Sequence, residues 1–213
     1  MSRMLFVVAI VVLTLLLPAT VAAQDATPAT GLGEPDPAEC TVEPRPMSFF
    51  EEFVGTPTAE QAARTEATPD AGFRMPDGTP ADEDTVAAVL GTVRQLGACI
   101  NAGDFLGGYG ALFTEDFIRD DLESSGPLAA EELSLTPEPM PAEMRVSLLA
   151  VVDVRVLPDG RVAGLFDIQD PFAEPPGPSR FYWEFVKEDG RWLIDEQIML
   201  GPMEPEQVGT PTS

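Results

Sequence analysis

RFYWEFVKEDGRWLIDEQIML, residues 180–200, is the stretch that decides the fold. Asp189-Gly190 lies between two runs rich in aromatic and β-branched residues, and this dipeptide readily adopts the positive φ angles of a tight hairpin turn. The stretch therefore predicts an antiparallel hairpin. Because side chains alternate along a strand, one face should carry the apolar residues, namely Phe181, Trp183, Phe185, Trp192, Ile194, Ile198 and Leu200. The other face is polar and charged and needs no cover; its residues are Arg180, Tyr182, Glu184, Arg191, Asp195 and Gln197.

Glu196 falls in phase with the apolar residues of the hairpin. The alternation therefore predicts a carboxyl group on the buried face. Apolar surroundings raise the pKa of a carboxyl group, which could then act as a general acid or base near neutral pH. The alternative is that Glu196 lies at an open edge, where it reaches water or pairs with an arginine.

Upstream of the hairpin, the chain changes from helical to strand periodicity. Apolar residues recur at helical spacing over 86–100, acids at 82–84 suit the start of that helix, and Gly103 suits its end. Asp104 and Thr114 each begin a further short helix. Apolar residues then alternate over 144–156 and 162–168, on either side of the turn Pro158-Asp159-Gly160. Helices followed by a four-stranded meander predict an α+β domain at 82–201, with helices on one face of the sheet.

The N-terminus has the features of an export signal. Arg3 precedes an apolar run at 4–17, and small residues follow it up to Ala23. This pattern predicts a cleavable signal peptide at 1–23, cut near Ala23; the alternative is an uncleaved anchor. The apolar run is shorter than the roughly 20 residues of a membrane-spanning helix. We therefore expect a secreted or extracytoplasmic protein that is not in the membrane after cleavage.

Cys40 and Cys99 are the two cysteines of the chain. In an oxidising compartment they are expected to form a disulfide, with two free thiols as the alternative. The bond would tether an N-terminal arm at 40–54, where Phe49, Phe50 and Phe53 share a helical face. These rings either plug the mouth of a cavity or cover an outer groove between helices.

Three further segments lack a repeating apolar face. Residues 24–39 and 202–213 are predicted to be disordered, and 55–81 is predicted to be a linker.

Composition excludes several classes of function. The formal net charge of −24 repels nucleic acid and anionic lipid, so neither is expected as a partner. The chain has no histidine, which rules out Ser–His and Cys–His nucleophiles. It also has no zinc ligand set, phosphate-binding glycine loop or dinucleotide fingerprint. We therefore expect neither a metal nor a cofactor.

Four motifs resemble the nuclear transport factor 2-like superfamily, and its SnoaL-like branch most closely: INAGDF at 100–105, ALFTEDF at 111–117, VLPDGRV at 156–162 and KEDGRWLIDE at 187–196. The resemblance covers 82–201. It implies a cone in which N-terminal helices pack on the concave face of a curved antiparallel sheet of about four strands, leaving a pocket. Members of the family include isomerases, cyclases, dehydratases, ligand binders and inactive accessory domains. They often dimerise through the sheet, so the resemblance implies a homodimer here as well.

The resemblance and the alternation together predict the lining of a ligand pocket: Tyr109, Phe113, Phe166, Trp183, Phe185, Trp192 and Glu196. Catalytic relatives place an Asp–His pair, or a tyrosine with two aspartates, in this pocket. Here the catalytic candidates are Glu196 as acid or base and Tyr109 as a donor to an oxyanion; ordinary packing is the alternative. We expect an exported, non-catalytic domain that binds a small apolar ligand or a protein partner. The alternatives are an acid–base enzyme of isomerase or cyclase type and an accessory module whose cone is filled by its own side chains.

Overall fold

The computed structural model describes residues 32–53, 73–125, 133 and 135–210. The five-stranded antiparallel sheet has the order β1-β2-β3-β4-β5, and three helices lie between its first two strands in the chain. The helices are α3 (Glu83–Asn101), α4 (Phe105–Leu112) and α5 (Glu115–Ser125). The strands are β1 (Thr79–Pro80), β2 (Ser147–Val156), β3 (Val162–Asp170), β4 (Gly177–Glu188) and β5 (Arg191–Pro202). The shorter helical pieces are η1 (Pro37–Glu39), α1 (Met47–Glu51), η2 (Ala142–Met144) and η3 (Pro205–Gln207).

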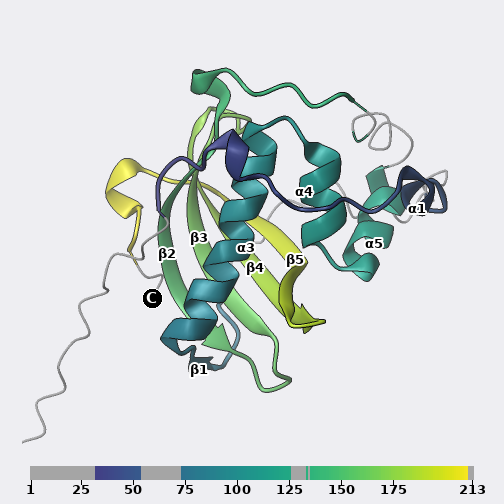
Figure 1. The fold of residues 1–213 in the computed structure, drawn as a ribbon. Coiled ribbons are helices and arrows are strands. Elements are labelled where there is room, and N and C mark those ends of the chain that lie inside the picture. Colours follow the sequence, from purple (N-terminus) through teal and green to yellow (C-terminus); the bar gives the residue numbers. More distant parts are fainter. Residues whose placement is uncertain (1–31, 54–72, 126–132, 134, 211–213) are drawn as a thin grey trace, which may run out of the picture.

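The predicted α+β class, with the helices on one face of the sheet, is confirmed (Figure 1). Helix α3 packs across the sheet, and α4 and α5 contact the edge strand β5. We call the face that α3 covers the helix-side face and the opposite one the outer face. The strand count is five rather than four, because the short strand β1 adds to the edge of β2.

The helix boundaries follow the local signals in the sequence. An oxygen of Asp82 accepts a hydrogen bond from the backbone N–H of Thr85 at 2.7 Å and caps α3. Asp104 caps α4 in the same way, accepting from Gly107 at 2.8 Å. Gly103 ends α3 with a φ of +68°, a left-handed conformation that glycine adopts without steric cost.

The predicted hairpin is confirmed, with its turn at Asp189-Gly190. On the helix-side face of β4, Phe181, Trp183 and Phe185 belong to the main hydrophobic core. The indole ring of Trp183 stacks on Phe166 of β3, with ring centroids 5.1 Å apart.

The alternation along β5 does not run straight through, because β-bulges interrupt its pairing with β4. Glu184 lies opposite Glu196, whereas the next residue of β4, Phe185, lies opposite Ile194. The extra residue, Asp195, is held by the hydroxyl of Thr114, which donates to its carboxylate at 2.8 Å. A bulge of one residue moves every following side chain to the other face. The prediction that Glu196, Ile198 and Leu200 lie on the buried helix-side face is therefore wrong; they lie on the outer face, and Gln197 and Met199 take their places.

Strand β2 departs from strict alternation for the same reason. Its pairing with β3 shifts after Leu148 and again around Asp153, which has a φ of +56°. As a result Ala150 and Val152 lie on the outer face, in a second hydrophobic cluster with Tyr182.

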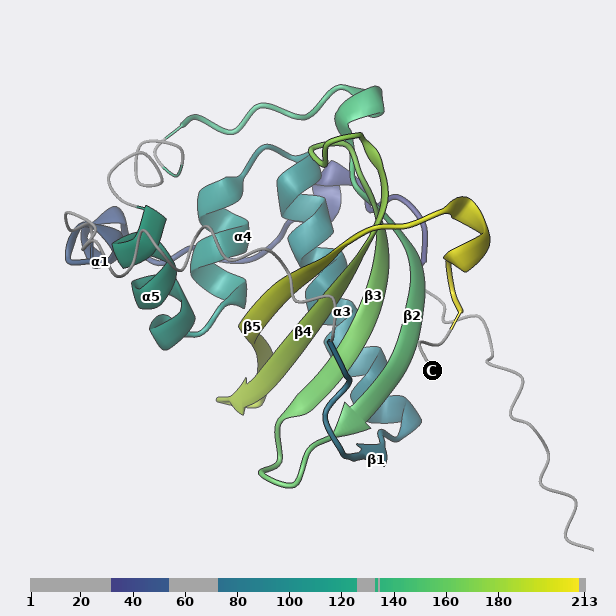
Figure 2. The ribbon, with the colours of Figure 1, turned by 180° about the vertical axis from the view of Figure 1, so that it is seen from behind.

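The outer face is covered by the chain itself, contrary to the expectation that only one face needs cover. Phe73 packs its ring on Tyr182 with centroids 4.8 Å apart, and Met75 joins the same cluster. The backbone N–H of Gly209 donates to the carboxylate of Asp167 at 2.6 Å. Figure 2 shows the tail crossing the upper ends of the strands, with η3 to the side of β2. The linker prediction is thus wrong for 73–81 and the disorder prediction is wrong for 202–210; residues 54–72 and 211–213 lie outside the described residues.

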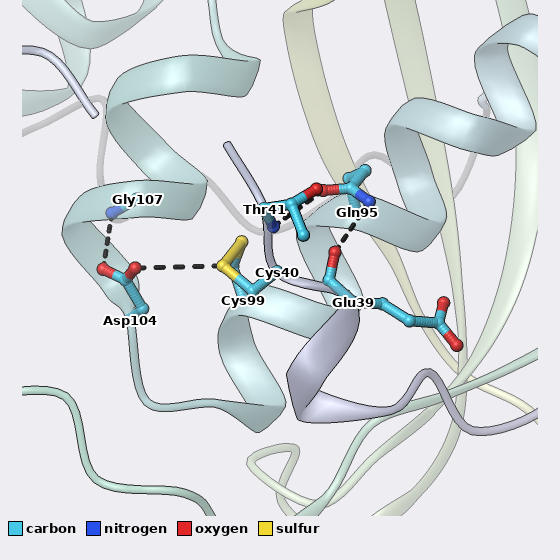
Figure 3. The surroundings of a disulfide bond; sticks show 7 residues. All are labelled: Glu39, Cys40, Thr41, Gln95, Cys99, Asp104 and Gly107. Carbon is cyan, nitrogen blue, oxygen red and sulfur yellow. Dashed lines mark hydrogen bonds between the residues drawn. A yellow bond between two sulfur atoms is a disulfide. The ribbon is translucent and has the colours of Figure 1, made fainter. Parts of the chain in front are cut away.

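The predicted disulfide is confirmed: Cys40 and Cys99 are bonded, with their Cα atoms 4.7 Å apart. Figure 3 shows the bond joining the arm to the last turns of α3. Glu39 reinforces it, because its side chain pairs with Arg94 at 2.6 Å and its carbonyl accepts from Gln95 at 2.8 Å. The disorder predicted for 24–39 is wrong from residue 32 onwards. The predicted signal peptide at 1–23 lies outside the described residues.

Asn101 joins three parts of the chain. Its buried side chain donates to the carbonyl oxygens of Pro35 and Val146, at 2.9 and 3.1 Å, and accepts from the N–H of Val146 at 2.8 Å. The last residue of α3 therefore anchors both the segment that precedes the arm and the segment that enters β2.

Candidate functional site

A cavity of about 840 Å³ lies between the helices and the helix-side face of the sheet. Sites for small molecules commonly enclose about 300–1,000 Å³ and are mostly apolar. The helices contribute Val93, Leu96, Ile100, Phe105 and Phe117 to its wall, and Phe113 follows the end of α4. The sheet contributes Leu148, Ile168, Phe181, Trp183, Gln197 and Met199. The cavity therefore has the size and the lining of a ligand-binding site.

Exposed apolar side chains gather at this cavity. Leu135, Phe172 and Met199 are the large hydrophobic residues that stay exposed in the described part of the chain, with exposed fractions of 63%, 52% and 41%. All three contribute to the lining. Exposed apolar residues that cluster usually mark a surface of interaction. The three side chains together form an apolar rim around the cavity.

Tyr109 and Asp121 place a polar pair in the wall. The hydroxyl of Tyr109, on α4, donates to the carboxylate of Asp121, on α5, at 2.5 Å. Burial raises the pKa of Tyr109 far above its ordinary value, and the negative charge of Asp121 raises it further. The phenol is therefore a hydrogen-bond donor and not a base at any physiological pH.

Two more aspartates contribute to the lining. Asp104 accepts from the N–H of Gly107 at 2.8 Å, and Asp170 accepts from the N–H of Phe172 at 2.8 Å. No lysine or arginine lines the cavity within the described residues. The ionisable groups of the wall are therefore acids and one protonated phenol.

Trp183 has a buried donor without a partner. Its indole Nε1 makes no hydrogen bond, and the side chain, which lines the cavity, is only 3% exposed. An unsatisfied buried polar group costs about 1–3 kcal/mol.

The predicted pocket residues separate into three groups. Tyr109, Phe113 and Trp183 line the cavity as predicted. Phe166 and Phe185 are fully buried in the core and do not line it, and Trp192 packs near Lys187.

Glu196 does not line the cavity either, since the bulge at Asp195 directs it to the outer face. There it faces Glu184, which binds both Arg161 and the hydroxyl of Tyr182. Tyr109 and Glu196 thus lie on opposite sides of the sheet. They cannot act together on one substrate, so the arrangement does not support the two catalytic candidates as a pair.

The pKa of Glu196 is nevertheless raised, first by desolvation and then by the charge of Glu184. The folded protein therefore holds this proton at a higher pH than the unfolded chain. The protonated form of Glu196 therefore favours the folded state over the charged form. This contribution to the free energy of unfolding is complete below the ordinary carboxyl pKa and is lost as pH rises through the raised pKa of the folded state.

Replacing Glu196 with glutamine removes this charge without changing the shape of the side chain. Because the residue as a whole is exposed, solvent screens the effect. We expect E196Q to be more stable than the parent protein by about 0.5 kcal/mol near pH 7, and equally stable near about pH 4. Urea unfolding at both pH values measures the difference in stability. If E196Q were also more stable than the parent protein in acid, the charge of Glu196 would not be the cause.

The phenylalanines of the arm cover helices and do not plug the cavity. Phe50 is fully buried against α4, where a Cβ added to Gly110 would lie 2.8 Å from its ring, and its ring centroid is 6.3 Å from that of Tyr109. None of Phe49, Phe50 and Phe53 lines the cavity. The cover hypothesis is confirmed and the plug hypothesis is wrong. Pro35, which precedes the arm, does line the cavity.

Sequence reasoning missed Asp121, Asp170 and Gln197 as residues of the wall. The acid-rich helix at 115–125 carries five Asp and Glu residues, so nothing in the pattern distinguished Asp121 from its neighbours. Gln197 was assigned to the polar face, and only the bulge moves it into the cavity.

Within the described residues, no cluster of His, Cys, Asp and Glu could hold a metal ion. In the same part of the chain, no helix is both long and apolar enough to span a bilayer. Comparison of the chain with family models, curated proteins and solved structures finds no match, so the resemblance to the nuclear transport factor 2-like superfamily stays a prediction.

Proposed function

We propose that this protein is an exported, non-catalytic domain that holds a small, mainly apolar molecule in its cavity. The observation that carries the proposal is an 840 Å³ space, lined mainly by apolar and aromatic side chains, that has an exposed apolar rim. This volume argues against an interior filled by the chain's own side chains.

The polar groups of the wall support binding rather than catalysis. The phenol of Tyr109 is already engaged with Asp121 and does not ionise. The chain contains no histidine to act as a base near neutral pH. The disulfide is compatible with an extracytoplasmic location, where such a domain would meet ligands outside the cell.

A single-tryptophan variant tests the proposal. The chain has two tryptophans, so W192F leaves Trp183 in the cavity wall as the only one. A brominated dodecanol that enters the cavity should quench its fluorescence in a saturable way, because bromine quenches an indole ring at close contact.

The matched control is W183F, which keeps Trp192 outside the cavity. We expect little quenching there by the same probe. Absence of saturable quenching in W192F, or equal quenching in both variants, would contradict a ligand in this cavity.

A further inference from the structure

The N-terminal arm carries a further inference, which rests on the proposed function and concerns how the cavity is held ready for its ligand. We infer that the arm positions the part of the cavity wall formed by α4, so that docking of the arm and binding of a ligand favour each other. The residue that does so most directly is Phe50, which acts through Tyr109 and does not itself line the cavity.

Helix α4 has little helical stability of its own. It has eight residues, FLGGYGAL, and three of them are glycines. Glycine is the least favourable residue in a helix after proline, and a helix this short is not stable in isolation. Phe105, Gly108 and Tyr109 of this helix line the cavity. The position of this wall therefore depends on what packs against α4 from outside.

Two of the glycines of α4 are points of close contact. A Cβ added to Gly110 would lie 2.8 Å from the ring of Phe50 and 3.2 Å from the backbone nitrogen of Arg45, both in the arm. A Cβ added to Gly108 would lie 3.1 Å from the Cβ of Cys99, to which the arm is bonded. The helix therefore lacks side chains at the places where the arm and its anchor come closest.

Phe50 connects the arm to the cavity wall. Its side chain is fully buried, and its ring centroid lies 6.3 Å from that of Tyr109. The ring of Tyr109 in turn packs on Phe113, with centroids 5.3 Å apart, and both residues line the cavity. Near the disulfide, the Sγ of Cys40 lies 3.8 Å from the carboxylate of Asp104, which caps α4 and also lines the cavity. Release of the arm would remove this packing from the back of the wall.

The arm also contacts α5. The guanidinium of Arg45 lies 3.8 Å from the carboxylate of Glu115, and the guanidinium of Arg119 lies over the ring of Phe53, 5.0 Å from its centroid. Figure 1 shows the arm passing from α3 past α4 to α1, beside α5. One covalently anchored segment thus contacts all three helices that line the cavity.

A wall that is already in place favours binding, because the ligand does not have to order it. Such coupling is reciprocal. If a docked arm strengthens binding of the ligand by some factor, a bound ligand strengthens docking of the arm by the same factor.

The variant G110A tests the coupling on the W192F protein. Alanine favours the helix, but its methyl group would occupy the place of Phe50 and Arg45 and so displace the arm. If the arm positions the wall, brominated dodecanol should bind at least about fivefold more weakly, as judged by quenching of Trp183. The matched control is G91A in α3. An added Cβ there lies within 4 Å of none of the described residues beyond its own stretch of helix, so the affinity should not change.

Reduction of the disulfide is a second test, which keeps every side chain of the arm. Dithiothreitol supplies the two electrons and two protons that convert Cys40 and Cys99 to thiols, and it closes to a cyclic disulfide. Reduced W192F should bind the probe more weakly than the oxidised protein. Saturating probe should lower the equilibrium constant of this reduction by the same factor. A bond that only stabilised the fold would leave that equilibrium independent of the probe.

The outcomes separate the two proposals. Absence of saturable quenching in oxidised W192F would overturn the ligand-binding proposal and the role of the arm with it. Equal affinity in oxidised W192F, reduced W192F and the G110A variant would overturn the role of the arm alone. An equal loss of affinity in G91A and G110A would also overturn it, because the loss would not depend on the arm. If G110A did not fold, the oxidised and reduced proteins would still decide the inference.

Discussion

Replacement of Arg180 by leucine is expected to destabilise the fold by about 3–5 kcal/mol, because it leaves a buried carboxylate without its cation. Arg180 and Asp167 are both buried on the outer face, and the guanidinium makes two hydrogen bonds to the carboxylate, at 2.6 and 2.9 Å. Asp167 also accepts from Gly209, and Arg180 donates to the carbonyl of Gln207 at 3.3 Å. The pair therefore attaches the C-terminal tail to the sheet.

Urea unfolding of R180L measures the loss. Two controls separate an unpaired charge from lost packing. In D167L/R180L both charges are absent, and we expect the double variant to recover much of the stability, since apolar replacement of a whole buried pair is often neutral. In R155L a partly exposed pair with Asp153 is broken, at a cost of no more than about 1 kcal/mol. If R180L is no less stable than R155L, the buried pair of Arg180 and Asp167 does not have the large effect that we expect.

Removal of the disulfide is the second large effect that we expect. The bond joins residues separated by 59 positions. The chain-entropy model predicts that closing such a loop stabilises the fold by about 4 kcal/mol. The double variant C40A/C99A should lose up to this amount in urea unfolding. Without the bond, the segment that leads into the arm remains attached through the contacts of Asn101 with Pro35 and of Arg94 with Glu39.

Reduced parent protein provides the matched control, because it keeps both sulfur atoms and lacks only the cross-link. It should unfold close to the double variant. If the double variant were much less stable than the reduced protein, the loss would come from packing at the fully buried Cys99 and not from the cross-link. Equal stability of the oxidised and reduced proteins would contradict a role of the bond in holding the arm.

The sequence by itself determined the features that depend on a few neighbouring residues. Asp189-Gly190 made the hairpin turn, Asp82 and Asp104 capped their helices, and Gly103 ended α3, because the backbone conformation and its nearest hydrogen-bond partners are local. The order of helices and strands then specified the α+β class. The disulfide followed from the number of cysteines and the predicted export signal, not from geometry.

Only the tertiary structure decided which face each strand residue occupies. The bulge at Asp195 depends on Thr114, a residue 81 positions away, and it sends Glu196 outward and Gln197 inward. The pairing of Tyr109 with Asp121 likewise requires two helices to meet. Docking of the tail on Asp167 requires the assembled sheet. Contacts between distant residues leave no periodic signal in the chain, so alternation alone predicted the elements of the site but not its chemistry.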